Sequence, residues 1–163
     1  MPVRPLTNAM FGFDSSCFVC NPTNPRGLQV AYSHDDEADV VTAEFSLDDA
    51  YSGAPSYVHG GALLALLDEA MAWACIAIEG VFGLTQTTQT TFLRPVRVGS
   101  HYRVEARVGR RDDEVIETSA SIINAGGNPC AEAVATFAVL TIEQAESALG
   151  VPVPDQDTRF TRD

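Results

Sequence analysis

The clearest pattern in the sequence is a long apolar stretch near its middle. Residues 60–78 consist almost entirely of Ala, Leu, Met, Trp, Cys and Ile after two opening glycines, and the stretch stops at Gly80. Apolar residues on nearly all sides predict a buried helix that other elements must surround. Because Asp68 and Glu69 interrupt the stretch, we expect a core helix, and no membrane as a partner.

The segments on both sides of this helix have the composition or the two-residue period of β-strands. The predicted strands are residues 28–33, 40–45, 85–93, 102–108, 115–123 and 131–142, with a hairpin turn at 124–129. Two strands, one long helix and four meandering antiparallel strands predict an α+β fold, in which a curved antiparallel sheet wraps the central helix.

The length of 163 residues predicts one domain. We expect a Pro- and Asn-rich N-terminal arm at residues 1–27, the folded core at 28–142, and a C-terminal tail at 143–163 that begins with a helical turn at 143–149 and is otherwise mobile. Outer sheet edges and leftover apolar surface favour a homo-oligomer.

The formal net charge is −12, and the ten cationic side chains are all arginine. Such an acidic chain argues against nucleic acid as a partner. A small anionic ligand stays compatible, because distant charges are screened over about 8 Å and local arginines decide phosphate binding. The first residues lack the apolar run of a secretory signal, so we expect a cytoplasmic location.

The four cysteines are Cys17, Cys20, Cys75 and Cys130. Cys17-x-x-Cys20 has the spacing of half a zinc site, but a structural zinc site uses four Cys or His ligands. No second close pair completes it. We therefore expect reduced, structural cysteines and no metal.

The tripeptide His59-Gly60-Gly61 opens the predicted helix. Backbone N–H groups at a helix start have no intrahelical acceptor, and glycine lets a ligand approach them closely. Together with the helix dipole, such amides can bind the oxyanion that forms when a carbonyl is attacked. The alternative is a tight loop-to-helix turn that uses glycine for its geometry alone.

The acidic pair Asp68-Glu69 lies in the middle of this apolar helix. A carboxylate there is costly unless it is paired, hydrogen-bonded or functional. Adjacent helical residues point about 100° apart, so the two carboxylates cannot serve one site. We expect one to face a cleft, where burial would raise its pKa, and the other to face the surface or an ion pair.

These residues resemble the signature of a known family. Val58-His59-Gly60-Gly61-Ala62, followed by Asp68-Glu69-Ala70, is similar to the motif of the hotdog-fold thioesterases related to the phenylacetate-pathway enzymes and the human THEM proteins. Cys17 and Cys20 followed by Asn24-Pro25-x-Gly27-Leu28, and the later Arg94-Pro95, also match members of that family. The resemblance covers roughly residues 17–142.

The resemblance implies a hotdog fold and hydrolysis of acyl-CoA or a similar thioester, with the CoA thioester as substrate and no cofactor. Asp68 would be the general base or the nucleophile, the Gly60 amide would bind the oxyanion, and His59 would shape the loop. Thr85 would orient the attacking water. Some relatives carry an Asn where this chain has Gly53, which leaves the choice between base and nucleophile open.

Further residues are candidates for substrate binding. Gly61 would allow close approach at the helix start, and Trp73 and Met71 would line an acyl pocket unless they are plain core. Arg94 and Arg97 would contact CoA phosphates unless they form surface ion pairs.

The resemblance also implies active sites between subunits, with Asp68 of one chain meeting the Thr85 strand of its neighbour. Two alternatives to a thioesterase stay open. One is a hotdog hydratase or dehydratase that uses His59 and Asp68 as an acid–base pair. The other is a non-catalytic acyl-CoA binding module.

Overall fold

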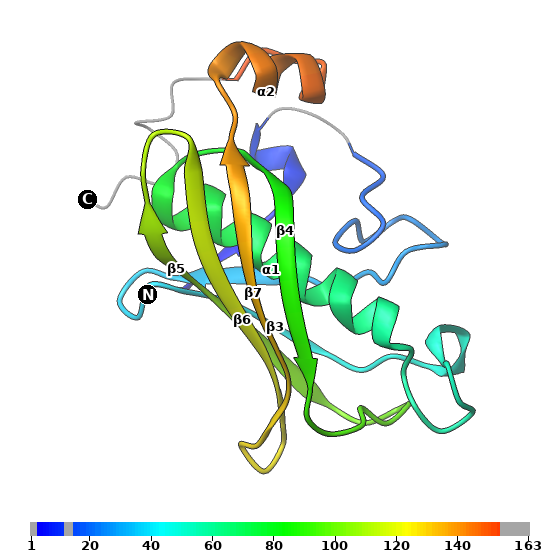
Figure 1. Ribbon diagram of the computed structural model, residues 1–163. Coiled ribbons are helices and arrows are strands. Elements are labelled where there is room, and N and C mark those ends of the chain that lie inside the picture. Colours follow the sequence, from blue (N-terminus) through cyan, green and yellow to red (C-terminus); the bar gives the residue numbers. More distant parts are fainter. Residues whose placement is uncertain (1–2, 12–14, 154–163) are drawn as a thin grey trace.

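One sheet of seven antiparallel strands curves around a long helix in the computed structural model, which describes residues 3–11 and 15–153 (Figure 1). The strands are β1 (Val3–Leu6), β2 (Tyr32–Asp35), β3 (Val40–Phe45), β4 (Gly83–Phe92), β5 (Tyr102–Arg111), β6 (Val115–Asn124) and β7 (Pro129–Val139). Short 3-10 helices lie at η1 (Asn8–Phe11) and η2 (Asp49–Tyr51). The predicted α+β hotdog architecture is confirmed.

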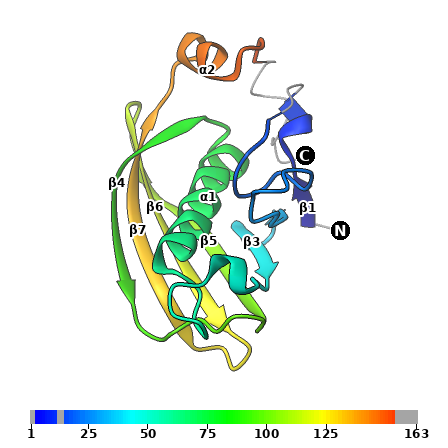
Figure 2. The same cartoon turned by 90° about the vertical axis from the view of Figure 1, so that its right-hand side faces the viewer.

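The central helix α1 (Gly60–Glu79) lies between the sheet and the N-terminal arm (Figure 2). Its length and mean hydropathy of 1.7 would suit a membrane span, but it contacts six strands of the sheet, β2 to β7. Leu66, Leu67 and Met71 are fully buried. The helix ends at Gly80, whose left-handed backbone (φ 69°) suits glycine and whose N–H bonds the last carbonyls. Tertiary packing therefore stabilises α1.

The strand order is β1-β2-β3-β5-β6-β7-β4, which corrects the predicted four-strand meander. Of the four strands after α1, β5, β6 and β7 pair in consecutive order, whereas β5 also pairs with β3 and β4 pairs with β7 at the far edge. Periodicity identifies strands but not their partners, because pairing is decided by how the chain crosses the sheet after β4. As a result β4 is an edge strand that runs beside α1.

The N-terminal arm joins the sheet more closely than the sequence indicates. Its first segment forms β1, which pairs with β2. The predicted strand at 28–33 is displaced to 32–35, because the backbone before it bonds to the arm instead. The Leu28 N–H donates to the Phe18 carbonyl at 2.8 Å, and the Val30 N–H donates to the Val19 carbonyl at 2.9 Å.

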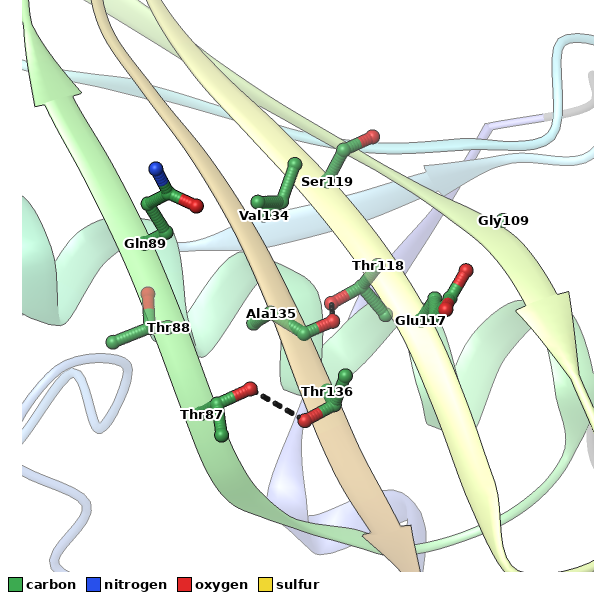
Figure 3. A pocket seen from close by; sticks show the side chains of 10 residues that line it. All are labelled: Thr87, Thr88, Gln89, Gly109, Glu117, Thr118, Ser119, Val134, Ala135 and Thr136. Carbon is green, nitrogen blue, oxygen red and sulfur yellow. Dashed lines mark hydrogen bonds between the residues drawn. The ribbon is translucent and has the colours of Figure 1, made fainter.

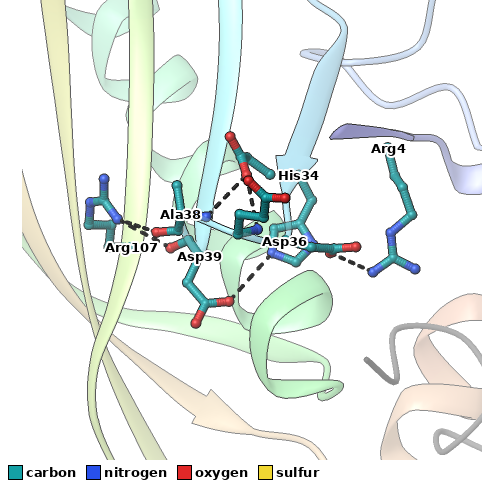
Figure 4. Close-up of polar contacts among 8 residues, drawn as sticks. Arg4, His34, Asp36, Ala38, Asp39 and Arg107 are labelled. Carbon is teal, nitrogen blue, oxygen red and sulfur yellow. Dashed lines mark hydrogen bonds and ion pairs between the residues drawn. The ribbon is translucent and has the colours of Figure 1, made fainter. Parts of the chain in front are cut away.

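A polar cluster joins β1, the β2–β3 turn and β5 (Figure 4). His34 lies in β2 and is buried, with Nδ1 2.9 Å from the Asp36 carboxylate. Arg4 lies 2.7 Å from the same carboxylate. On the other side of the turn, the Arg107 guanidinium donates to the Ala38 carbonyl at 2.7 Å. The cluster thus links β1, the β2–β3 turn and β5 at one end of the sheet.

The C-terminal part contains helix α2 (Ile142–Leu149), where a helical turn is predicted. Thr141 caps it and forms a reciprocal capping box with Gln144, so β7 ends at Val139 and not at the predicted residue 142. The remainder of the predicted mobile tail, from residue 154, lies outside the described residues.

Truncating α1 at its most buried point should destabilise the whole fold. Leu66 is 0% exposed, so Leu66→Ala should lower the free energy of unfolding by about 2–5 kcal/mol. Ile142 is 55% exposed, and Ile142→Ala should change it by less than about 0.5 kcal/mol. Urea denaturation of both variants measures the difference. Equal losses would contradict a core organised around α1.

Candidate active site

The side chain of His59, which is a candidate site residue from the sequence, caps the start of α1. His59 is the N-cap residue, with extended backbone, and its Nδ1 accepts a hydrogen bond from the Gly61 N–H at 2.8 Å. An accepting Nδ1 leaves the imidazole proton on Nε2. The Gly60 N–H has no acceptor among the described residues. One amide, that of Gly60, is therefore presented to a ligand, while that of Gly61 is occupied.

Two glycines make this cap sterically accessible. A Cβ on Gly53 would lie 3.3 Å from His59 Cδ2, so glycine at that position leaves room for the imidazole ring. A Cβ on Gly60 would meet only the Phe92 ring, at an ordinary 3.5 Å. A surface hollow of about 290 Å³ opens here, and its lining includes Gly60, Phe92 and Arg94. The start of α1 at Gly60 therefore borders an open hollow.

Asp68 lies two turns further along α1 and faces β4. The Thr85 hydroxyl donates to Asp68 Oδ1 at 2.6 Å. The Asp68 carboxylate is half-buried, and no ion pair joins it to a cation within the described ranges. The contact with Thr85 lies within one chain, which corrects the expectation that Thr85 of a neighbouring subunit would make it.

A β-bulge orients Thr85 toward α1. The pairing of β4 with β7 shifts register between Thr85 and Thr87, so that Thr85 lies opposite Phe137 and Thr87 lies opposite Thr136. Phe137 is buried in the core. Because an extra residue in a strand reverses which face its neighbours occupy, the bulge places Thr85 on the inner face and Thr87 on the outer one.

The two halves of the predicted chemistry are far apart within one chain. Gly60 and Asp68 are eight residues apart on a straight helix, which separates them by about 12 Å along its axis. A single thioester carbonyl cannot contact both. Gly60 lies beside Phe92 and Asp68 beside Thr85, so α1 and β4 run antiparallel, with one candidate group at each end of the strand.

The predicted acyl-pocket residues do not lie beside Asp68. Trp73 is 3% exposed and lines a cavity of about 230 Å³ together with Glu69, on another face of α1. Met71 is fully buried and belongs to the core. Trp73 and Met71 therefore pack α1 against its surroundings and do not form a pocket at Asp68.

Arg94 and Arg97 are exposed and make no ion pair within the described part of the chain. An Arg94 Nη1 donates to the Pro129 carbonyl at 2.5 Å, and the Arg97 guanidinium lies 5.6 Å above the Tyr57 ring. The alternative of surface ion pairing is therefore not found for either residue. Both guanidinium groups retain donors for an anion.

Glu69 carries the raised pKa that the sequence predicts for a buried acidic group in this helix. Burial raises the pKa of its carboxyl group to about 7, and Cys17 Sγ lies 3.3 Å from Oε1. This contact between Cys17 and Glu69 is not predicted from the sequence. Both the Cys-x-x-Cys segment and the acidic pair are visible in the sequence. Because 52 residues separate Cys17 from Glu69, however, the sequence does not indicate that they meet.

A hollow of about 540 Å³ lies on the outer face of β4, β6 and β7 (Figure 3). Hydroxyl groups are frequent there, and the Thr87 and Thr136 hydroxyls are 2.6 Å apart. This hollow is on the face of the sheet opposite α1, so it belongs to neither Asp68 nor Gly60. The threonine-rich strand is both an edge strand and the border of this hollow.

Comparison with known proteins supplies the family context. The sequence profile of the thioesterase superfamily matches residues 56–131. A phenylacetic acid degradation-related protein from Ralstonia eutropha JMP134 is 30% identical, over 69% of this chain and 86% of that one, with a TM-score of 0.61. No curated protein sequence matches.

Two further crystal structures share the fold. A thioesterase superfamily protein is 25% identical over 79% of this chain, with a TM-score of 0.67, and this chain spans 64% of its length. A protein from Streptococcus mutans UA159, solved bound to acetyl CoA, is 18% identical over 63% of this chain and 82% of that one, with a TM-score of 0.60.

The His59 cap should contribute measurably to stability. His59→Ala removes the acceptor for the Gly61 N–H and should lower the free energy of unfolding by about 1 kcal/mol. His59→Asn keeps a side-chain acceptor and should recover most of that loss. Thermal unfolding of the two variants distinguishes them, and equal destabilisation would show that the cap hydrogen bond is not what His59 contributes.

Proposed function

The chain belongs to the thioesterase superfamily, and we propose that it hydrolyses an acyl-CoA, or a similar thioester, to a carboxylic acid and a free thiol. The observation that carries this proposal is the half-buried Asp68 carboxylate, hydrogen-bonded to Thr85 on an edge strand and without a cationic partner among the described residues. The Streptococcus mutans relative, which holds acetyl CoA, supports a CoA thioester as the substrate class.

The proposed reaction centre needs two subunits. The edge strand β4 is exposed over most of its length, and Leu84 and Phe92 at its two ends are 58% and 54% exposed. Such an unpaired, partly apolar edge favours pairing with a second copy. Antiparallel pairing of β4 with the same strand of a partner sets the Thr85 end of one strand against the Phe92 end of the other. Asp68 then approaches the Gly60 amide of the partner.

In this arrangement the chemistry divides between the subunits. The Gly60 N–H of one chain binds the thioester oxygen as negative charge develops on it. On the other chain, the Thr85 hydroxyl holds Asp68 Oδ1, which leaves Oδ2 to take a proton from water. Attack by that water on the carbonyl carbon gives a tetrahedral oxyanion. Its collapse breaks the C–S bond, and the proton passes from Asp68 to the departing thiolate.

Asp68 also fits a nucleophilic role, in which its carboxylate attacks the carbonyl and water then hydrolyses the acyl anhydride. The general-base route never puts solvent oxygen into Asp68. The nucleophilic route does so when water attacks the Asp68 carbonyl of the anhydride, so ¹⁸O in the Asp68 carboxylate after a single turnover in ¹⁸O-water would identify that route.

Arg94 is proposed to contact the phosphates of the thiol carrier. It lines the same hollow as Gly60, and Arg97 lies near it in sequence without an ion pair in the described ranges. Two guanidinium groups near the helix start, without ion pairs in the described ranges, give a local positive site on a chain whose net charge is −12.

Replacing the Asp68 carboxylate should abolish most turnover without unfolding the protein. Asp68→Asn should lower kcat by at least about 100-fold, because the amide cannot accept the proton from water. The exposed Asp113→Asn is the matched control and should retain wild-type turnover. Release of free thiol from a panel of acyl-CoAs is the measurement. Near-normal hydrolysis by Asp68→Asn would remove this carboxylate from the mechanism.

The same assay separates the alternative functions when a crotonyl thioester is included. A hydratase would remove the enoyl absorbance without releasing thiol. A binding module would bind the thioester and change neither signal. Thiol release is the outcome expected here.

Mixing two inactive variants should restore activity if the centre is shared. Gly60→Pro deletes the donor N–H at the first helical position, where proline is well tolerated and the extended backbone of His59 suits it. Coexpression with Asp68→Asn should form mixed dimers that contain one intact centre, giving about a quarter of wild-type activity for random pairing.

Gly60→Ala keeps the N–H and is the control for added bulk. Absence of recovery in mixed dimers, verified by native mass spectrometry, would place both groups in one chain or exclude one of them.

A further inference from the structure

A second cluster of polar side chains lies between α1 and the N-terminal arm, separate from Asp68. The sulfur atoms of Cys17 and Cys20 and a carboxylate oxygen of Glu69 all lie within 4.8 Å of one another. Cys17 and Cys20 come from the N-terminal arm, and Glu69 from the middle of the helix that the arm covers (Figure 2). Two segments far apart in sequence thus bring three potential metal ligands together.

The arm holds the first sulfur in a defined position. The N–H groups of Val19 and Cys20 approach Cys17 Sγ at 3.4 and 3.5 Å, which stabilises a thiolate there. A Cβ at Gly27 would lie 2.7 Å from the Phe18 carbonyl oxygen, so only glycine allows the following segment to pass this turn. The Cys-x-x-Cys turn is therefore built by specific backbone contacts.

Within the part of the chain that the structure describes, cationic side chains do not pair with this cluster. No arginine or histidine forms an ion pair with Glu69 in the described ranges. The Cys17 sulfur lies 3.3 Å from the Glu69 carboxylate. Thiol and carboxyl groups can each give up a proton and bind a metal ion, so three of them in contact suit a cation.

We propose that Cys17, Cys20 and Glu69 bind a divalent zinc-class cation, which fastens the N-terminal arm to α1. Thiolate and carboxylate ligands at about 2.3 and 2.1 Å from zinc lie about 3.5–4 Å apart on a tetrahedron, close to the spacing of this cluster. The fourth position faces the cavity of about 230 Å³ that Cys17, Glu69 and Trp73 line, and water can occupy it.

This site is independent of the proposed hydrolysis. Glu69 points about 100° away from Asp68 around the helix, toward the arm and not toward β4. The sequence-based expectation of no metal counted cysteine and histidine alone. The fold adds a carboxylate, which is an established zinc ligand.

Metal binding by the purified full-length protein, reduced with a phosphine, tests the proposal. After incubation with Zn²⁺ and dialysis, elemental analysis should find one zinc per chain. Titration with Co²⁺ should give thiolate-to-cobalt charge-transfer absorption. Cys17→Ser and Cys20→Ser should weaken Zn²⁺ binding at least about 100-fold and Glu69→Gln at least about 10-fold, whereas Cys75→Ala and Cys130→Ala should bind as the wild type does.

A chelator should lower the Tm of the zinc-loaded wild type and leave that of Cys17→Ser unchanged. Asp68→Asn should bind zinc normally, which separates this site from the proposed hydrolysis. Absence of stoichiometric Zn²⁺ and of the Co²⁺ absorption in the reduced wild type would overturn the proposal. Unchanged affinity in Cys17→Ser, Cys20→Ser or Glu69→Gln would overturn it equally.

Discussion

Burial of α1 against the concave side of the sheet is the constraint on which the rest of the structure depends. The helix is apolar on nearly all sides, so it must be covered by strands β2 to β7 on one side and by the N-terminal arm on the other. The two acidic residues in the middle of the helix then have to leave the core in different directions. Asp68 points to the edge strand and Glu69 to the arm, where each finds a polar partner. One buried helix thus organises two chemically distinct sites.

The edge position of β4 explains why the candidate active site is incomplete in a single chain. An interior strand beside α1 could also bring Thr85 to Asp68. Only an edge strand, however, leaves one side free along its whole length for pairing with a second copy of the chain. The helix is long enough that its capped start and its carboxylate cannot reach one carbonyl. Length and edge position together therefore favour a centre built at a two-fold interface, where two incomplete halves complement each other.

Features decided by local sequence were predictable, and those decided by long-range contacts were not. The bounds of α1, its stop at Gly80, β3 and the hairpin at 124–129 follow from periodicity and turn chemistry. The place of β4 at the edge, the pairing of β1 and the burial of His34 depend on partners distant in sequence. The bulge after Thr85 is also invisible in a run of threonines and glutamines, because every residue there suits either face of a strand.

Asp68 and Glu69 are both candidates for the general base, and their positions decide between them before any pKa value does. A general base works best with a pKa near neutrality, and on that ground alone Glu69, with a pKa of about 7, would be preferred to its neighbour. Yet Glu69 lies against Cys17 beneath the arm, and Gly60 lies more than two helical turns away. Asp68 faces the strand edge, where a partner can bring an oxyanion donor to it. The raised pKa of Glu69 reflects burial beneath the arm and does not mark the general base.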